Sequence, residues 1–111
     1  MIVHWGDSDG GQPSVVLDGP NTTPGVTVTR CQTNGGGTAG EYLIDLPAGL
    51  LPVRNIVVTP NTSASSDPTV ARMARASIAG GIGGCGGGDV LVQISLHDGT
   101  AKATGAFVAI N

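Results

Sequence analysis

Short segments rich in valine, isoleucine, threonine and leucine follow one another along the whole chain, separated by glycine, proline and asparagine. β-Branched residues favour strands, whereas the separating residues favour turns. We therefore expect strands at residues 2–5, 14–17, 26–31, 41–46, 53–59, 69–78, 90–97 and 106–110. About eight short strands predict an all-β domain, either a jelly roll or a β-sandwich of antiparallel strands.

The clearest alternation of apolar and polar residues lies in the segment 90–97. The core face of this predicted strand consists of Val90, Val92, Ile94 and Leu96. The turn-forming residues Asp98 and Gly99 follow directly. The chain is therefore expected to return as an apolar strand at 106–110, which closes the domain with a C-terminal hairpin.

Two aromatic residues are expected to contribute to the core. Tyr42 lies on the apolar face of 41–46, opposite Leu43, which is expected on the solvent side. A buried tyrosine needs a partner for its hydroxyl, so we expect a polar group beside Tyr42. Phe107, in the last strand, is predicted to be the main aromatic residue of the core.

The segment 69–78 fits two local structures. Asp67, Pro68 and Gly80 have the positions of an N-cap, a first helical residue and a stop, and the alanines between them favour a helix. The same segment also alternates as a strand does, with Arg72 interrupting its apolar face. Local sequence leaves both structures open.

Length and composition restrict the classes of function. A chain of 111 residues is expected to form one domain, residues 1–111. Five basic residues and a net charge of −3 provide no basic stripe, so nucleic acid is not an expected partner. No apolar run approaches the roughly 18 residues that span a bilayer, so no membrane association is expected.

Few residues suggest chemistry, and the chain is not expected to be an enzyme or to hold a cofactor. The two histidines, His4 and His97, each lie at the edge of a predicted strand. A metal site with Asp7 or Asp98 as third ligand would require the first and the penultimate strands to pair. Solvent-facing polar residues are the simpler interpretation of both histidines.

The glycine-rich segment 80–88 is the most unusual part of the chain. Nucleotide binding is excluded because the lysine and the following helix of a phosphate-binding loop are missing. The segment is a spacer between strands, or it forms a contact surface in which glycines allow close backbone approach. We favour the contact surface, with Ile82 and Cys85 as its subunit or receptor contacts.

The two cysteines, Cys31 and Cys85, allow one intrachain disulfide. A bridge closing so long a loop would stabilise the fold by about 4 kcal/mol in the chain-entropy model. Without knowledge of the distance between their Cα atoms, a bridge and two free thiols stay open.

Three strand motifs together carry a family resemblance. They are Gly40-Glu-Tyr-Leu-Ile-Asp-Leu46, Ile56-Val-Val-Thr-Pro60 and Gly105-Ala-Phe-Val-Ala-Ile110. The chain resembles the small jelly-roll domains of bacteriophage tail fibres and virions, which are related in shape to the trimeric complement and tumour-necrosis-factor heads. Leu46 replaces the usual aromatic residue of the first motif, and the glycine segment is unusual. The resemblance favours a strand at 69–78.

The resemblance implies a function in assembly. The expected protein is a non-enzymatic virion component, a capsid decoration or tail-fibre module that forms a homotrimer and contacts other virion proteins of the capsid or tail. The alternative is a carbohydrate- or receptor-binding module of the same architecture, which would contact a glycan or receptor on the host surface. Sugar-binding surfaces usually contain tryptophan or tyrosine. The chain has one of each, Trp5 and Tyr42, and this scarcity weighs against the alternative.

Overall fold

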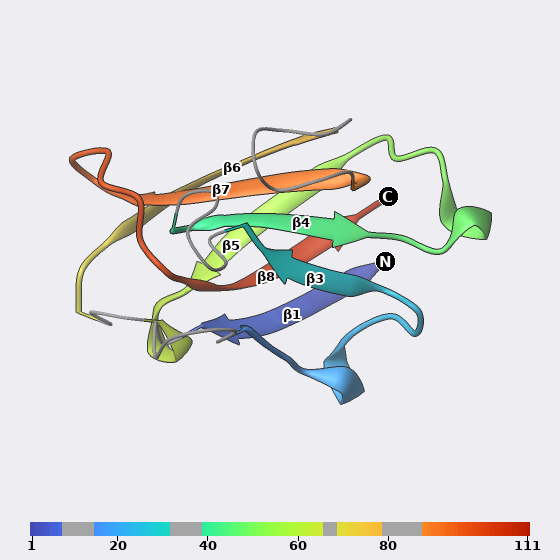
Figure 1. The fold of residues 1–111 in the computed structure, drawn as a ribbon, viewed down its shortest axis with the longest axis horizontal. Helices are drawn as coiled ribbons and strands as arrows, with labels where there is room; N and C mark the ends of the chain where they lie inside the picture. Colours follow the sequence, from blue (N-terminus) through green and yellow to red (C-terminus); the bar gives the residue numbers. More distant parts are fainter. Residues whose placement is uncertain (8–14, 32–38, 66–68, 79–87) are drawn as a thin grey trace.

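A computed structural model describes residues 1–7, 15–31, 39–65, 69–78 and 88–111 of the chain (Figure 1). These residues form eight strands and three short 3₁₀ turns. The strands are β1 (Ile2–Asp7), β2 (Val15–Leu17), β3 (Thr27–Arg30), β4 (Glu41–Asp45), β5 (Ile56–Asn61), β6 (Arg72–Ile78), β7 (Val90–Leu96) and β8 (Gly105–Ile110). The prediction of an all-β domain with eight strands is confirmed. No helix within the described residues is long and apolar enough to cross a membrane.

The strands form two four-stranded antiparallel sheets that pack as a β-sandwich. Sheet A has the order β2-β1-β8-β5, and sheet B has the order β3-β4-β7-β6. The first strand pairs with the last, and β4 pairs with β7, so the two halves of the chain wrap around each other (Figure 1).

The predicted C-terminal hairpin is wrong, although its turn is present. Gly99 has φ +90°, and the Thr100 backbone N–H donates to Asp98 Oδ1 at 2.9 Å. After this turn Ala101 still bridges to Ser95, but the chain then crosses to the other sheet. The strand β8 therefore pairs with β1 and β5 and not with β7.

Segment 69–78 contains a strand. In β6, Arg72 to Ile78 pair with β7 over seven positions, from Arg72 opposite Leu96 to Ile78 opposite Val90. The helix signals around Asp67 and Pro68 lie outside the described residues. Seven pairs with β7 give the backbone of β6 its hydrogen-bond partners on one side, and this tertiary pairing outweighs the weak local preference for a helix.

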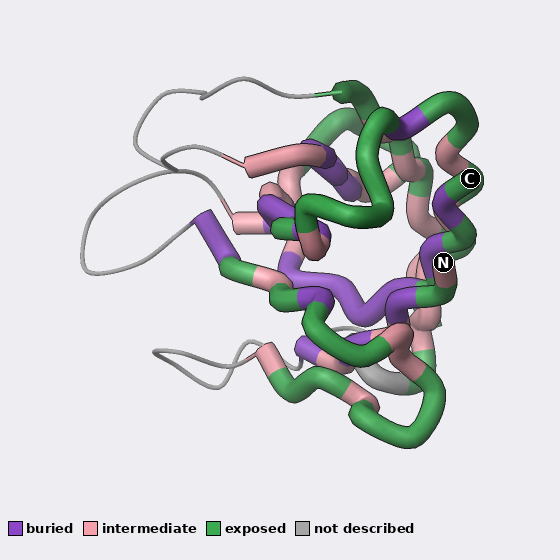
Figure 2. The backbone as a smooth tube through the Cα atoms, turned by 90° about the vertical axis from the view of Figure 1, so that its right-hand side faces the viewer, coloured by how far each residue is buried: buried purple, intermediate pink, exposed green. Residues whose placement is uncertain are grey.

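The core lies between the sheets and is formed by alternate residues of the strands (Figure 2). Trp5 is fully buried, whereas Phe107 is 45 % exposed on the outer face of sheet A. The prediction that Phe107 is the main aromatic core residue is therefore wrong, and Trp5 has that place. Both faces of the last strand are apolar, so the sequence pattern could not decide which face is buried.

A second, smaller cluster lies on the outer face of sheet B. Leu43, Leu91 and Cys31 are 4 %, 2 % and 2 % exposed. Gly88 lies against Leu43, because a Cβ at that position would be 3.1 Å from the leucine side chain. The expectation that Leu43 faces solvent is therefore wrong.

Gly40 is the position where the fold requires glycine most clearly. Its φ is +82°, a conformation that other residues rarely adopt. A Cβ there would also overlap the backbone oxygen of Ile94 and come within 2.9 Å of the Lys102 nitrogen. Gly40 thus lets β4 begin against both β7 and the segment that leads to β8.

Candidate functional site

A buried polar cluster joins the two sheets. Asp7 of β1 is 1 % exposed, and Arg30 of β3 is 3 % exposed. Arg30 Nη1 donates to Asp7 Oδ1 at 3.4 Å, and the Tyr42 hydroxyl donates to Asp7 Oδ2 at 2.7 Å. The polar partner expected for Tyr42 is thus Asp7, which the sequence analysis did not identify. Burial, together with the neighbouring carboxylate, raises the pKa of Tyr42 well above its ordinary value, so the phenol stays a neutral donor.

Thr104 extends this cluster to the segment before β8. Its backbone N–H donates to the Tyr42 hydroxyl at 2.8 Å, and its carbonyl accepts from Trp5 Nε1 at 3.1 Å. Its side-chain oxygen accepts from Arg72 Nε at 3.3 Å. A buried acid, base and phenol with a perturbed pKa are the kind of group found in active sites. Here their hydrogen bonds are mutual, and none of Asp7, Arg30 and Tyr42 lines any of the three described surface hollows.

The alternation pattern contained a signal for this cluster. Asp7 has the same parity as Val3 and Trp5 along β1, and Arg30 has the same parity as Val28 along β3. In a strand, residues of one parity share a face. Extending the apolar face of each strand to its last residue would have predicted a buried carboxylate at Asp7 and a buried guanidinium at Arg30.

His4 lies in a second polar group, on the outer face of sheet A. Its Nδ1 is 2.8 Å from Asp18 Oδ2, and its Nε2 is 3.1 Å from Asn61 Nδ2. The imidazole also stacks on the ring of Phe107, with the centroids 3.9 Å apart. Hydrogen bonds from Asn21 and then His4 hold the pKa of Asp18 below its ordinary value. Both ring nitrogens of His4 have protein partners, and this group includes no nucleophile.

The expected condition for a two-histidine metal site fails. The strand β1, which contains His4, belongs to sheet A, whereas His97 follows β7 of sheet B. The two strands do not pair. Asp7 is buried on the Arg30 side, and Asp98 accepts from the Thr100 backbone. Among the described residues, no group of three His, Cys, Asp or Glu side chains is arranged to hold a metal ion.

The outer face of sheet A is apolar and exposed. Ile2 is 60 % exposed and Val57 is 63 % exposed, and Ala109 lies between them because it pairs with both. The next row contains Phe107 beside His4. The only charged residue in the four strands of sheet A is Asp7, which points into the core. We call Ile2, Val57, Phe107 and Ala109 the apolar face.

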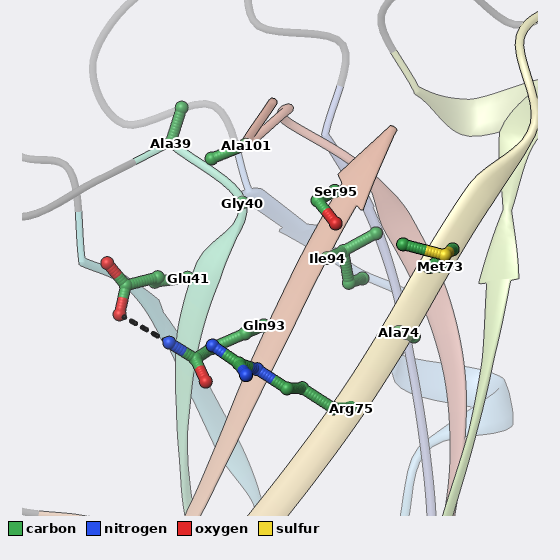
Figure 3. Close-up of a pocket in the computed structure, with 10 residues that line it drawn as sticks. All are labelled: Ala39, Gly40, Glu41, Met73, Ala74, Arg75, Gln93, Ile94, Ser95 and Ala101. Atoms are coloured by element: carbon green, nitrogen blue, oxygen red, sulfur yellow. Dashed lines mark hydrogen bonds between the residues drawn. The ribbon is translucent and has the colours of Figure 1, made fainter. Parts of the chain in front are cut away.

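The outer face of sheet B has a hollow of about 310 Å³ (Figure 3). Its charged and polar lining residues are Glu41 of β4, Gln93 and Ser95 of β7, and Arg75 of β6. Met73 stands at one side of the hollow, and Ala39 and Ala101 stand at the other (Figure 3). We call this surface the charged face. The sequence analysis assigned no role to these residues.

The structure does not test the residues predicted as subunit or receptor contacts. Ile82 and Cys85 lie outside the described residues, so their proposed role as subunit or receptor contacts stays a prediction. Cys31 is buried at the end of β3 and is disulfide-bonded. Its predicted partner Cys85 is not among the described residues, and the pairing stays a prediction as well.

The geometry thus offers two outer surfaces for contacts and a polar cluster enclosed between the sheets. Comparisons of the chain with protein-family models, with curated proteins and with solved structures find no match in any of the three.

Proposed function

We propose that this chain is a non-enzymatic structural component of a bacteriophage virion, a module that decorates a capsid or forms part of a tail fibre. It assembles as a homotrimer and contacts other virion proteins. The observation that carries the proposal is the apolar face, with Ile2, Val57 and Phe107 45–63 % exposed on one side of a sheet. Contiguous exposed apolar residues mark contact surfaces, because leaving them in water is unfavourable.

The apolar face suits contact with further copies of the same chain. Each copy has a net charge of −3, and a contact surface without charged side chains adds no local like-charge repulsion to that of the whole molecules. No charged residue of the four strands points outward on this face. The virion setting and the threefold symmetry come from the resemblance of the strand motifs to phage jelly-roll domains.

The enclosed polar cluster supports a non-enzymatic role. Asp7, Arg30 and Tyr42 bond to one another between the sheets, where a substrate has no described route to them. Their hydrogen bonds connect β1 with β3 and β4, and this structural role explains why they are buried together. The histidine of the outer group, His4, has both ring nitrogens engaged.

The assembly is tested by light scattering at high ionic strength, which screens weak charge contacts and leaves apolar burial. We expect a mass about three times 10.9 kDa for the parent and a monomer for Val57→Asp. The matched control is Ile78→Asp, at a 66 % exposed apolar position of sheet B, which should keep the trimer mass. A monomeric parent, or a Val57→Asp variant with unchanged mass, would overturn the proposed assembly.

The virion location has its own test. Antibodies against the domain should label native particles in electron microscopy, at the capsid surface or at the tail. Particles without label would refute the virion role even if the protein is a trimer.

A second candidate function is glycan binding, and one observation favours it. A hollow of about 420 Å³ beside Phe107 is lined also by Asn21 and Thr23, whose polar groups suit sugar hydroxyls. Trp5 and Tyr42 are both fully buried and cannot serve as sugar platforms, which leaves Phe107. A glycan array separates the two functions, because a glycan-binding module should give a signal that Phe107→Ala abolishes.

A further inference from the structure

The charged face has opposite charges on the two sides of a central strand. Glu41 pairs in register with Gln93, and Gln93 pairs in register with Arg75. The row therefore crosses three strands, which spans about 10 Å between its ends. Gln93 Nε2 donates to Glu41 Oε2 at 3.3 Å, as Figure 3 shows. No salt bridge between described residues involves Arg75, whose side chain is exposed.

A second row of residues runs beside the first, and its side chains are large on one side of β7 and small on the other. Met73 pairs in register with Ser95, and Met73 is 53 % exposed. On the other side of Ser95, Ala101 bridges to it, and Ala39 lines the same side of the hollow. One side of the row thus has a long apolar side chain, and the other side has only methyl groups (Figure 3).

We propose that the charged face binds a second copy of the chain, face to face, about a two-fold axis that runs along β7 in the plane of contact. This rotation exchanges the β4 side with the β6 side and leaves Gln93 and Ser95 of β7 opposite their own copies. Glu41 of each copy then faces Arg75 of the other. Met73 of each copy enters the hollow over Ala39 and Ala101 of the other. Each of these contacts forms twice, as a two-fold contact requires.

Charge complementarity decides in favour of a second copy. The rotation places the acidic side of one copy over the basic side of the other. A shift of one copy along the strands does not exchange the two sides and therefore does not create this match. Size complementarity follows the same axis, because the rotation places the long side chain over the two alanines. The charge pairs and the size match involve different residues, and both are satisfied by the same two-fold axis.

The contact is expected to be weak and sensitive to salt. Exposed ion pairs contribute little individually and are screened as ionic strength rises. This inference rests on the proposed self-assembly, but it concerns the opposite side of the sandwich. Val57→Asp removes the contact through the apolar face and leaves the charged face unchanged, so the two proposals can be tested separately.

The experiment is analytical ultracentrifugation of the Val57→Asp protein at low and at high ionic strength. We expect a mass approaching twice 10.9 kDa at low ionic strength and a monomer at high ionic strength. In this background Glu41→Arg and Arg75→Glu each place like charges opposite each other, and each should weaken association about tenfold or more. The double reversal restores opposite charges at unchanged net charge, and it should restore association.

The control and the overturning results are equally specific. Arg54→Glu makes the same change in net charge at an exposed position away from the face and should leave a stronger dimer than Arg75→Glu does. Far-ultraviolet circular dichroism confirms that each variant is folded. A Val57→Asp protein that is monomeric at low ionic strength would overturn the inference, as would single reversals without effect or a double reversal that stays monomeric.

Discussion

Tyr42 shows how a single hydroxyl can connect the two sheets of this sandwich. It donates to the Asp7 carboxylate of sheet A and accepts from the Thr104 backbone, so its loss would remove one hydrogen bond from Asp7 and leave the buried Thr104 N–H without its acceptor. Each unsatisfied buried group costs about 1–3 kcal/mol. The ion pair of Asp7 with Arg30 has a desolvation cost of its own, so its presence alone does not indicate a net gain in stability, whereas removing one partner would leave a buried charge.

Alkaline pH provides a test of this position. The pKa of Tyr42 is raised in the folded protein above the ordinary value of 10.0, so the folded state keeps a proton that the unfolded state loses. The resulting stability is complete below pH 10 and decreases as pH rises above it, by about 1.4 kcal/mol per pH unit. We expect the free energy of unfolding to fall above pH 10 in the parent. In Tyr42→Phe it should start about 1–3 kcal/mol lower and fall less steeply. Parallel slopes in urea titrations across this pH range would contradict the prediction.

Alanine substitutions at three glycines separate the cost of a positive φ from the cost of steric overlap with neighbouring atoms. Gly49 has ordinary φ and open surroundings, Gly99 has φ +90° in open space, and Gly40 has φ +82° with backbone atoms in contact range. Alanine should be nearly neutral at Gly49 and cost about 1–2 kcal/mol at Gly99. At Gly40 it should cost clearly more, because the strand β7 cannot move away. Thermal melting of the three variants gives the order, and equal losses at Gly40 and Gly99 would refute the role of close approach.

Most elements were predictable because their strands have a local signature, the ambiguous segment 69–78 excepted, whereas the partners of the strands were not. All eight expected segments contain a strand, and alternation placed Val90, Val92 and Ile94 on the core face correctly. The crossing of the chain between β7 and β8 depends on pairing with β1, which lies at the other end of the sequence. The turn at Asp98 and Gly99 has the same local chemistry whether the chain stays in the sheet or leaves it.

The candidate surfaces were less predictable than the fold. Glu41, Gln93 and Arg75 come from three separate segments and meet only through strand register. The apolar face was hidden for a different reason, since β8 is apolar on both sides and its pattern has no period to show which side is exposed. The cluster of Asp7 and Arg30 is the exception, because parity along β1 and β3 would have placed both residues inward had the first predicted strand been extended to Asp7.

Two positions on opposite faces of β8, Phe107 and Ile110, test which of its faces is the core face. Ile110 is 2 % exposed between the sheets, and Phe107 is 45 % exposed on the apolar face. Ile110→Ala should lower the free energy of unfolding by about 2–5 kcal/mol. Phe107→Ala should lower it by less than about 2 kcal/mol despite the larger side chain, because half of that ring is already in water. Denaturation in the Val57→Asp background at high ionic strength keeps both proposed subunit contacts out of the comparison. A larger loss at Phe107 than at Ile110 would reverse the assignment of faces.

At the scale of the whole molecule, the two proposed contact surfaces lie on opposite outer faces of the sandwich. The apolar face belongs to sheet A, and the charged face belongs to sheet B. A subunit that forms a closed trimer through one face and a two-fold contact through the other can extend an assembly beyond the trimer. The two proposed contacts should respond differently to salt, because screening weakens charge pairs and leaves apolar burial.

This difference leads to a prediction for the size of the parent assembly as a function of ionic strength. At high ionic strength the parent should have a mass about three times 10.9 kDa, and at low ionic strength the mass should grow to at least twice that of the trimer. Glu41→Arg should give the trimer mass at both ionic strengths, because only the charged face is altered. Val57→Asp should give dimers at low and monomers at high ionic strength. Light scattering on the three proteins distinguishes the contacts, since a parent whose mass does not change with salt has no second, charge-dependent contact. If Glu41→Arg grows with the parent at low ionic strength, the growth uses another surface, and the two-fold contact along β7 is refuted.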